Sequence, residues 1–351
     1  LRCGIAGPVV FNVDPLSGPY TEQLIMGEVQ GTSATNTVTF NGNGRTIQFL
    51  STNTNERAVI KLNGTDHFIF DSLTVVAQGT QTTEYGFGFH LTNGADSNII
   101  RNSTININQT STSSNYAGIV SSAGTTATAT GTNESDWNVI DNNTINGGYY
   151  GITNVGSTTS AVGNNKITNN RVRDFYFYGI YLSGNFNTLV EANDISRPTR
   201  ADVSTFYGVY LTSLNTSVKV SKNRMHNPFD GEPTATSTFA GVYLTSVDAL
   251  SGLENVISNN AVYNVNGNGI QYGLYNSNSD NALYYFNTIN LDNASTSTND
   301  SYGFYQTGTA TGIELKNNLI TITRNTPGDK WLLYFATATS VITSDYNGFY
   351  K

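Results

Sequence analysis

One seven-residue motif recurs through most of the chain and limits the possible fold more than any other feature. It has an apolar second residue, Asn at the fifth position and an apolar seventh residue. Its copies are VIDNNTI (139–145), KITNNRV (166–172), LVEANDI (189–195), KVSKNRM (219–225), VISNNAV (256–262), LYYFNTI (283–289) and ELKNNLI (314–320). The recurring asparagines are Asn143, Asn170, Asn193, Asn223, Asn260, Asn287 and Asn318. Such irregularly spaced repeats are typical of a solenoid whose coils share a core while their loops vary.

These asparagines are expected to stack on one another. Strands of neighbouring coils lie about 4.8 Å apart, so seven stacked asparagines form a ladder of side-chain amides. Each amide has donors and an acceptor, and therefore bonds to the coils above and below it. Asn also tolerates the bent backbone between two strands. We therefore interpret the ladder as structural rather than catalytic.

A second motif alternates with the first. It appears in YGIYLSG (178–184), YGVYLTS (207–213) and YGFYQT (302–307), where Gly precedes alternating apolar residues. Each coil then holds this strand and, after a loop, two short strands joined at the asparagine. We predict an all-β fold, a right-handed parallel β-helix with three strands per coil, because parallel connections are right-handed by default. One core stack is predicted to contain Ile100, Ile140, Ile167, Val190, Val220 and Ile257.

Composition agrees with this fold and excludes several functions. Only 12% of the residues are charged, and the abundant Thr, Val, Ile and Tyr favour strands. The net charge of −8 lacks the basic footprint that nucleic-acid binding requires. No segment has the length of an apolar membrane span, so membrane insertion is not expected. Cys3 is the only cysteine, which excludes an internal disulfide.

The chain resembles the right-handed parallel β-helix repeat proteins of the pectin-lyase-like superfamily, most of all those in large secreted or surface proteins of Bacteroidetes-type bacteria. The likeness rests on both motifs, on the opening GPVVFNVDPLSGPYTEQLIM (7–26) and on the closing ITSDYNGFY (342–350). It implies a secreted or cell-surface location. It also implies one domain, with an N-terminal cap and first coils over 1–56 and regular coils over 57–351. The scaffold hosts lyases, hydrolases, esterases and adhesins, so it does not specify the function.

Strand alternation predicts which side chains face outward from the Gly-containing strand. The outward residues are His90, Val120, Thr153, Tyr181, Tyr210, Tyr243, Tyr275 and Tyr305. Two places further along come the hydroxyl residues Ser183, Thr212, Thr245, Ser277 and Thr307. Aromatic faces bury the apolar faces of sugars while hydroxyls bond their edges, so this stripe favours binding of a polysaccharide or surface glycan. The alternative is that the stacked tyrosines only stabilise one another or cover a neighbouring domain.

A catalytic site is less evident. The enzymes of this superfamily carry outward carboxylates on this strand, and the outward positions of this chain carry none. A charged cluster of Arg171, Asp194, Arg224 and His226 could serve a polysaccharide lyase or glycoside hydrolase, with His226 accepting a proton. Arg197 and Arg200 lie near it in sequence. The interpretation we favour is an ion-pair ladder on a solvated face, which recurs often without function.

Metal and cofactor signals are weak. Three scattered histidines make no ligand spacing, and no cofactor is expected. Loop acids in GTD (64–66), NESD (133–136) and NDS (299–301) could hold Ca²⁺. We therefore predict a non-enzymatic module for adhesion or polysaccharide binding. The alternatives are the enzyme at the charged cluster and a structural spacer or filament subunit that contacts flanking domains or its own copies.

Overall fold

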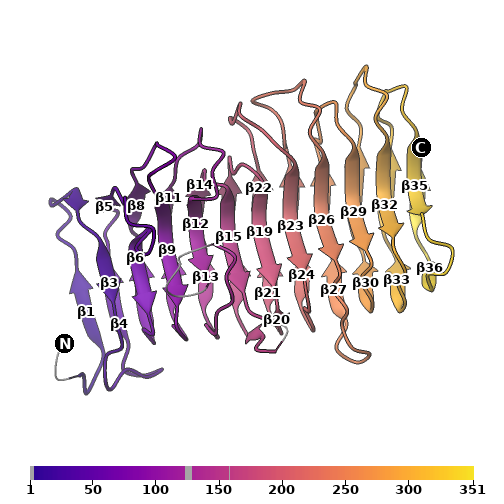
Figure 1. Ribbon diagram of the computed structural model, residues 1–351. Coiled ribbons are helices and arrows are strands. Elements are labelled where there is room, and N and C mark those ends of the chain that lie inside the picture. The colour runs from indigo at the N-terminus through magenta and orange to yellow at the C-terminus, as the bar shows by residue number, and fades with distance from the viewer. Residues whose placement is uncertain (1–3, 123–128, 158) are drawn as a thin grey trace.

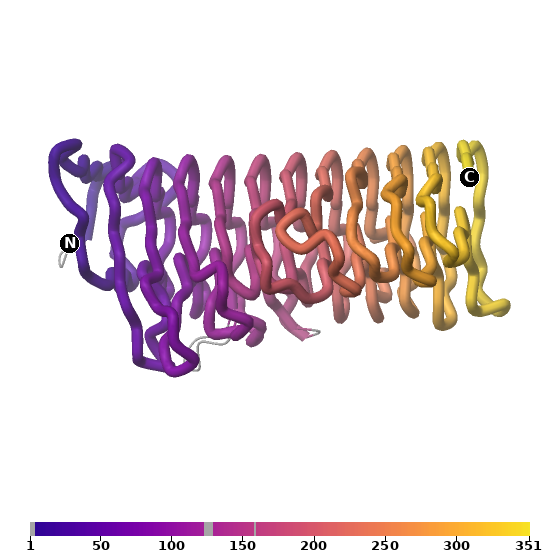
Figure 2. The backbone as a smooth tube through the Cα atoms, turned by 90° about the horizontal axis from the view of Figure 1, so that it is seen from above, coloured from indigo at the N-terminus to yellow at the C-terminus, as the bar shows by residue number. Residues whose placement is uncertain are grey.

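The computed structural model describes residues 4–122, 129–157 and 159–351, which form one parallel β-solenoid. Three long sheets, here called A, B and C, contain 12, 12 and 11 strands. Figure 1 shows the coils side by side, with the two chain ends at opposite ends of the stack. Figure 2 shows the same succession of coils from above. Cys3 lies outside the described residues.

The strands of each sheet come from successive coils. Sheet A contains β1 (Val9–Asn12), β4 (Val38–Asn41), β7 (Phe68–Asp71), β10 (Ile99–Arg101), β13 (Val139–Asp141), β17 (Lys166–Thr168), β21 (Leu189–Glu191), β24 (Lys219–Ser221), β27 (Asn255–Ser258), β30 (Ala282–Tyr285), β33 (Ile313–Lys316) and β36 (Ile342–Asp345). Sheet B contains β2 (Tyr20–Thr21), β5 (Thr46–Phe49), β8 (Thr74–Ala77), β11 (Thr104–Asn106), β14 (Thr144–Asn146), β18 (Arg171–Arg173), β22 (Asp194–Ser196), β25 (Arg224–His226), β28 (Ala261–Tyr263), β31 (Thr288–Leu291), β34 (Leu319–Ile322) and β37 (Gly348–Tyr350).

Sheet C carries the Gly-containing strands. It contains β3 (Leu24–Met26), β6 (Ala58–Asn63), β9 (Gly86–Thr92), β12 (Tyr116–Ser121), β15 (Tyr150–Val155), β19 (Tyr178–Ser183), β23 (Phe206–Thr212), β26 (Phe239–Thr245), β29 (Gln271–Ser277), β32 (Ser301–Thr307) and β35 (Lys330–Phe335). A small extra sheet pairs β16 (Val162–Gly163) with β20 (Asn185–Phe186). Each coil passes from sheet A through the asparagine corner to sheet B, and then through a loop to sheet C.

The core confirms the predicted solenoid. Neighbouring strands are parallel and in register, so that Val190 pairs with Val220, and Ile195 pairs with Met225. The predicted core stack is buried throughout: Ile100, Ile140, Ile167, Val190, Val220 and Ile257. Burial of such aliphatic columns is the main stabilising contribution in a chain with few charges. The three long sheets begin with β1, β2 and β3 and continue without a break past residue 56, the expected boundary between the first coils and the regular coils.

The asparagine ladder forms as predicted. In each step the Oδ1 of one asparagine accepts the backbone N–H of the asparagine one coil earlier, as Asn223 does from Asn193 at 3.0 Å. The same Asn223 donates from Nδ2 to the Val190 carbonyl at 2.9 Å. Ser103 precedes the first asparagine of the ladder, and Asn347 extends the ladder beyond the last predicted member.

The bent residue at this corner is not the ladder asparagine itself. The residue before it adopts the left-handed conformation, with φ of 57° at Asn169 and 58° at Lys222. Asn169 shows that Asn does tolerate the bent backbone between the two strands, one position before the ladder asparagine. The physical reason is that its amide must point inward to reach the neighbouring coils, and the preceding residue makes the turn that aims it there.

A glycine in the strands of sheet C from β9 to β32 changes which side chains face outward. A Cβ on Gly208 would lie 2.6 Å from Cγ of Met225 in the core and 2.5 Å from the Gly241 carbonyl oxygen. Gly208 and Val209 are both buried, whereas Tyr207 and Tyr210 on either side are partly exposed. Two tyrosines three residues apart therefore share the outer face of the sheet.

Within the described ranges, no helix has the length and apolar character of a membrane span.

Candidate functional site

The predicted tyrosine stripe is one continuous column on the outer face of sheet C. The strand registers pair its members in the order Tyr181, Tyr210, Tyr243, Tyr275 and Tyr305. Successive ring centroids lie 5.3, 5.3, 4.2 and 5.0 Å apart. Tyr334 continues the column at 5.3 Å from Tyr305, and all six rings are partly exposed. Tyr334 was missed because its strand lacks the Gly of the other coils.

A second aromatic column runs beside the first and was also missed. Its members are Tyr150, Tyr178, Tyr207, Tyr272, Tyr302 and Trp331. Tyr178 stacks on Tyr207 at 5.3 Å, and Tyr272 stacks on Tyr302 at 5.1 Å. The sequence signal was the tyrosine directly before most of the Gly residues, which strict alternation from the outward tyrosines assigns to the core face. In β26 this place is taken by Ala240. We call the two columns together the tyrosine face.

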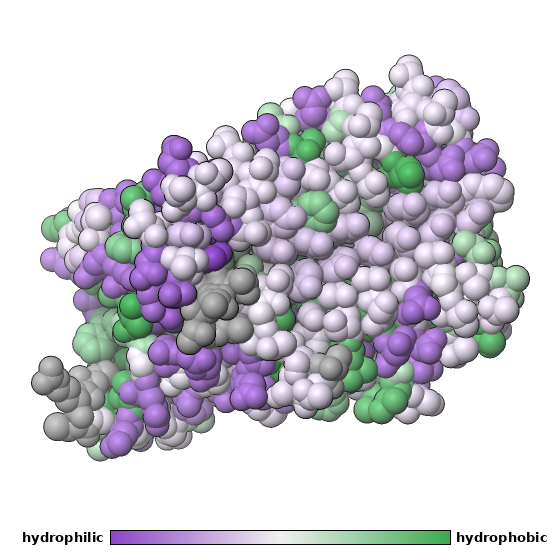
Figure 3. Space-filling model, viewed as in Figure 1, coloured by the Kyte–Doolittle hydropathy of each residue, from purple (hydrophilic) through white to green (hydrophobic). Residues whose placement is uncertain are grey.

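Hydroxyl residues border the tyrosine face. The registers align Ser183, Thr212, Thr245, Ser277 and Thr307, and each of them is partly exposed. From Tyr181 to Tyr334, the outward columns of sheet C carry no Asp or Glu. The view in Figure 3 has a broad pale centre, with strongly hydrophilic and strongly hydrophobic residues gathered mainly toward its margins. The face is therefore aromatic, hydroxylated and free of charged side chains.

The phenols of Tyr181, Tyr207 and Tyr272 stay neutral over the whole physiological range. Burial, together with a smaller contribution from the neighbouring Tyr210, raises the pKa of Tyr181 to about 12. Burial and the nearby tyrosines likewise raise the pKa of Tyr207 and of Tyr272 to about 12. Neutral phenols both donate and accept hydrogen bonds. The face can therefore donate hydrogen bonds to sugar hydroxyls and accept hydrogen bonds from them, without carrying charge.

The N-terminal part of sheet C differs from this face. His90, Val120 and Thr153 were predicted to face solvent, and this was wrong, since all three are fully buried. Val120 packs with Phe87 and Ala129 in a small hydrophobic cluster outside the main core. The structure thus covers the outer side of sheet C here, and only the strands from β19 onward carry the regular tyrosine column.

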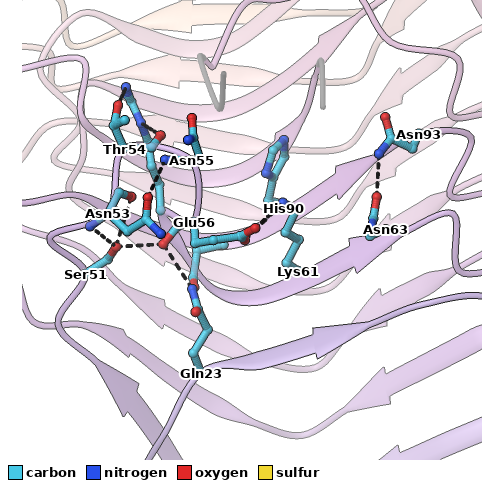
Figure 4. Close-up of polar contacts among 12 residues, drawn as sticks. Gln23, Ser51, Asn53, Thr54, Asn55, Glu56, Lys61, Asn63, His90 and Asn93 are labelled. Atoms are coloured by element: carbon cyan, nitrogen blue, oxygen red, sulfur yellow. Dashed lines mark hydrogen bonds and ion pairs between the residues drawn. The ribbon is translucent and has the colours of Figure 1, made fainter. Parts of the chain in front are cut away.

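Polar contacts fill the first coils of the same side. Figure 4 shows His90 beside Lys61, with Gln23 and Ser51 converging on the segment that carries Glu56. Lys61 Nζ lies 3.0 Å from a carboxylate oxygen of Glu56. Gln23 Nε2 donates to the Glu56 carbonyl at 3.0 Å, and Ser51 Oγ donates to it at 2.6 Å. This end of the sheet is a packed polar network.

The charged cluster lies on sheet B, on a different side of the solenoid from the tyrosine face. Arg171, Asp194 and Arg224 pair in register on successive strands, as the motif predicts. Asp194 bonds Arg224 at 2.8 Å and His226 Nε2 at 3.2 Å. The His226 ring stacks on Tyr263 at 4.9 Å. These contacts form a small ion-pair network around a single carboxylate.

The histidine and carboxylate of this network shift each other's proton affinity. Burial by itself lowers the pKa of His226, but hydrogen bonds with Asp194 and Asn227 raise it above its usual value. The hydrogen bond from His226, opposed by burial, lowers the pKa of Asp194. The pair is therefore stabilised in its charged form. A general acid–base pair would need a second carboxylate or a free base here.

Arg197 and Arg200 do not belong to this surface network, contrary to their grouping in the sequence. Both are almost completely buried. Arg197 donates to the carbonyls of Pro228, Tyr176 and Ser204 at 2.7–2.8 Å and lies over aromatic rings, including Phe229 at 4.8 Å. The two side chains hold the loops between sheets B and C together rather than facing a ligand.

The carboxylates of the loop acids accept hydrogen bonds from backbone N–H groups elsewhere in the chain. Asp66 Oδ1 accepts the N–H of Asp96 at 2.8 Å, and Asp136 Oδ1 accepts the N–H of Gly163 at 2.6 Å. Asp300 accepts the N–H of Asp329 at 2.9 Å. Among the residues that the structure describes, no group of three His, Cys, Asp or Glu side chains is placed to hold a metal ion. The proposed Ca²⁺ ligands therefore do not converge.

Comparison with known structures agrees with the fold. A GH136 lacto-N-biosidase from Eubacterium ramulus aligns with a TM-score of 0.57 at 11% identity, over 94% of this chain and 60% of that chain. The periplasmic alginate epimerase AlgG, as a point mutant, aligns with a TM-score of 0.54 at 12% identity, over 98% and 79%. The Dettilon tailspike protein gives a TM-score of 0.48 at 12% identity, over 92% and 61%. The chain thus spans about 60% of the length of the tailspike and the lacto-N-biosidase.

No curated protein matches the chain. Residues 122–320, more than half of the chain, match the family described as the right handed beta helix region. The matched segment spans the asparagine ladder and most of the tyrosine face. The chain therefore belongs to the right-handed β-helix family.

Proposed function

We propose that this domain is a non-enzymatic polysaccharide-binding module of a secreted or cell-surface protein, and that its tyrosine face is the binding surface. The observation that carries the proposal is the column of partly exposed tyrosines from Tyr181 to Tyr334, which runs over six successive coils and is bordered by hydroxyls. A second aromatic column flanks it and is interrupted at Ala240. Scattered exposed aromatic residues need no explanation, but a contiguous aromatic surface favours a ligand. Sugars suit it because their apolar faces pack on rings and their hydroxyls bond the edges.

The repeat of the face also suits an extended chain. Coils follow one another at about 4.8 Å, which is about the length of one sugar ring. A glycan lying along the solenoid axis would therefore meet a new ring of the column from Tyr181 to Tyr334 at each sugar. A single stacked ring contributes about 0.5–1.5 kcal/mol, so one contact is weak and several together give useful affinity.

The solved relatives support the class of ligand. The two structures with the higher TM-scores are named for a lacto-N-biosidase and an alginate epimerase, both carbohydrate-active proteins. One of them is described as periplasmic. Their low identity conveys the shared scaffold alone, so the argument for binding rests on the tyrosines of this chain.

A glycan array followed by calorimetric titration tests the proposal. Replacement of Tyr210 and Tyr243 by Ala removes adjacent rings from the column and is expected to weaken binding about 5- to 150-fold, since two lost ring contacts amount to roughly 1–3 kcal/mol. The matched control is Tyr263→Ala, which removes a tyrosine from sheet B instead. The control should bind like the parent protein.

The competing interpretation is that the rings serve only to stabilise the coils. In that case the double variant lowers the midpoint of urea unfolding, and no glycan on the array binds the parent protein. Binding that persists unchanged in the folded double variant would also refute the proposed surface.

A further inference from the structure

Trp137 combines a left-handed backbone with an exposed aromatic side chain, as Phe286 and Tyr346 do at the asparagine corner. It adopts the left-handed conformation with φ of 58°, which is unfavourable for a bulky side chain. The equivalent residues of the next three coils are Asn164, Asn187 and Ser217, which suit this conformation better. The indole is 60% exposed, and no other aromatic ring packs on it in the described part of the chain. The case for a site at Trp137 therefore rests on the residues around its exposed indole.

Trp137 lines a shallow groove at the corner where the chain passes from sheet C to sheet A. The groove has a volume of about 330 Å³. Its other lining residues include Asn164, Lys166, Asn187 and Lys219. The amides of Asn164 and Asn187 lie in a row, joined by a hydrogen bond of 2.7 Å. The groove therefore runs along the solenoid axis, away from the outer face of sheet C.

Two unpaired cations lie along this groove. Lys166 and Lys219 both pair in register with Leu189, so they are two coils apart, about 10 Å along the axis. Both are exposed, and neither forms an ion pair with any described residue. The nearby Lys222 differs, since it bonds Glu191 at 3.0 Å. In a chain of net charge −8, free lysines beside an exposed indole are a local exception.

We propose that this groove is a second carbohydrate site, distinct from the tyrosine face, and that it binds an oligosaccharide bearing carboxylate or sulfate groups. The indole of Trp137 stacks on one sugar ring, and the amide row bonds hydroxyls of the next sugars. Lys166 and Lys219 bind anionic groups spaced about two sugars apart, because each coil step is about one sugar in length. The uncharged tyrosine face lacks this selectivity, so the two sites differ in the charge of the glycan that they accept.

Tryptophan fluorescence separates the two sites. The chain has two tryptophans, Trp137 in the groove and Trp331 in the tyrosine face. In a Trp331→Phe background, emission therefore reports on Trp137 alone. Titration with tetragalacturonate at low salt is expected to shift or quench this emission, and the fully methyl-esterified tetrasaccharide is expected not to. Raising the ionic strength to about 1 M should abolish the response, because exposed charges are then screened.

Charge variants in the same background complete the test. Lys166→Gln with Lys219→Gln should weaken tetragalacturonate binding about tenfold or more. Lys222→Gln removes one charge at the asparagine corner after β24, outside the groove, and should leave the response unchanged. Circular dichroism establishes that each variant is folded. A response that is absent, equal for the esterified sugar, or retained by the double lysine variant overturns the proposal.

The proposal is independent of the tyrosine face. Replacement of Tyr210 and Tyr243 by Ala in the Trp331→Phe background should preserve the Trp137 response to tetragalacturonate. Loss of that response in the folded tyrosine variant would mean that the groove is not a separate site, and would overturn this inference without contradicting the tyrosine face.

Discussion

Replacing Asn223 by Ala tests the role of the ladder most directly. Its side chain donates to the Val190 carbonyl and to Asn260 Oδ1, and accepts from both the backbone N–H and the side chain of Asn193, all at 2.9–3.0 Å. The substitution leaves the Asn193 N–H without this acceptor and the Val190 carbonyl without this donor, in a fully buried site. A buried main-chain group left unsatisfied costs about 1–3 kcal/mol. We therefore expect the free energy of unfolding to fall by about 2–4 kcal/mol.

Urea unfolding followed by circular dichroism measures this loss. The matched control is Asn290→Ala, because Asn290 lies in β31 and its side chain bonds only Asp292, at the surface. Its effect should stay within about 0.5 kcal/mol. Asn223→Ser should fall between the two, since Ser103 already shows that a hydroxyl can accept the N–H of the preceding coil. An Asn223→Ala variant as stable as the control, or one that keeps its stability but loses glycan binding, would refute a structural ladder.

Three further predictions concern the core and the charged cluster. Because His226 has a raised pKa, its contribution to stability is complete below its usual value of 6.5 and is lost as the pH rises through its value in the folded protein; the melting temperature should therefore fall over this window, and His226→Gln should flatten the fall. Gly208→Ala should lower the free energy of unfolding by about 1–3 kcal/mol in urea, because its Cβ would lie 2.5 Å from the Gly241 carbonyl oxygen; an unchanged midpoint would contradict the close approach of the coils. The purified protein should leave pectate and alginate uncut with or without calcium, and an ultraviolet-absorbing product abolished by Arg224→Ala or His226→Ala would instead establish an enzyme at that cluster.

Repeated local rules make much of this fold predictable from sequence. Each coil must place apolar side chains in the core columns and an amide at the corner. The pattern of Val190, Asn193 and Ile195 therefore recurs at the equivalent positions of the other coils. Parallel in-register stacking then brings equivalent residues together. For the same reason the column from Tyr181 to Tyr305 follows from the motif, once the strand is known to alternate between core and solvent.

Only the tertiary structure decided what lies outside the repeat. Burial of His90 depends on segments that cover sheet C, and burial of Arg197 depends on one carbonyl of its own loop and two from other loops. Neither leaves a periodic signal, because loop lengths and paths differ between coils. The outward direction of Tyr207 depends on the bend at Gly208, which breaks the alternation that sequence reasoning assumes. The groove at Trp137 likewise joins residues of successive corners, and their proximity exists only after the coils have stacked.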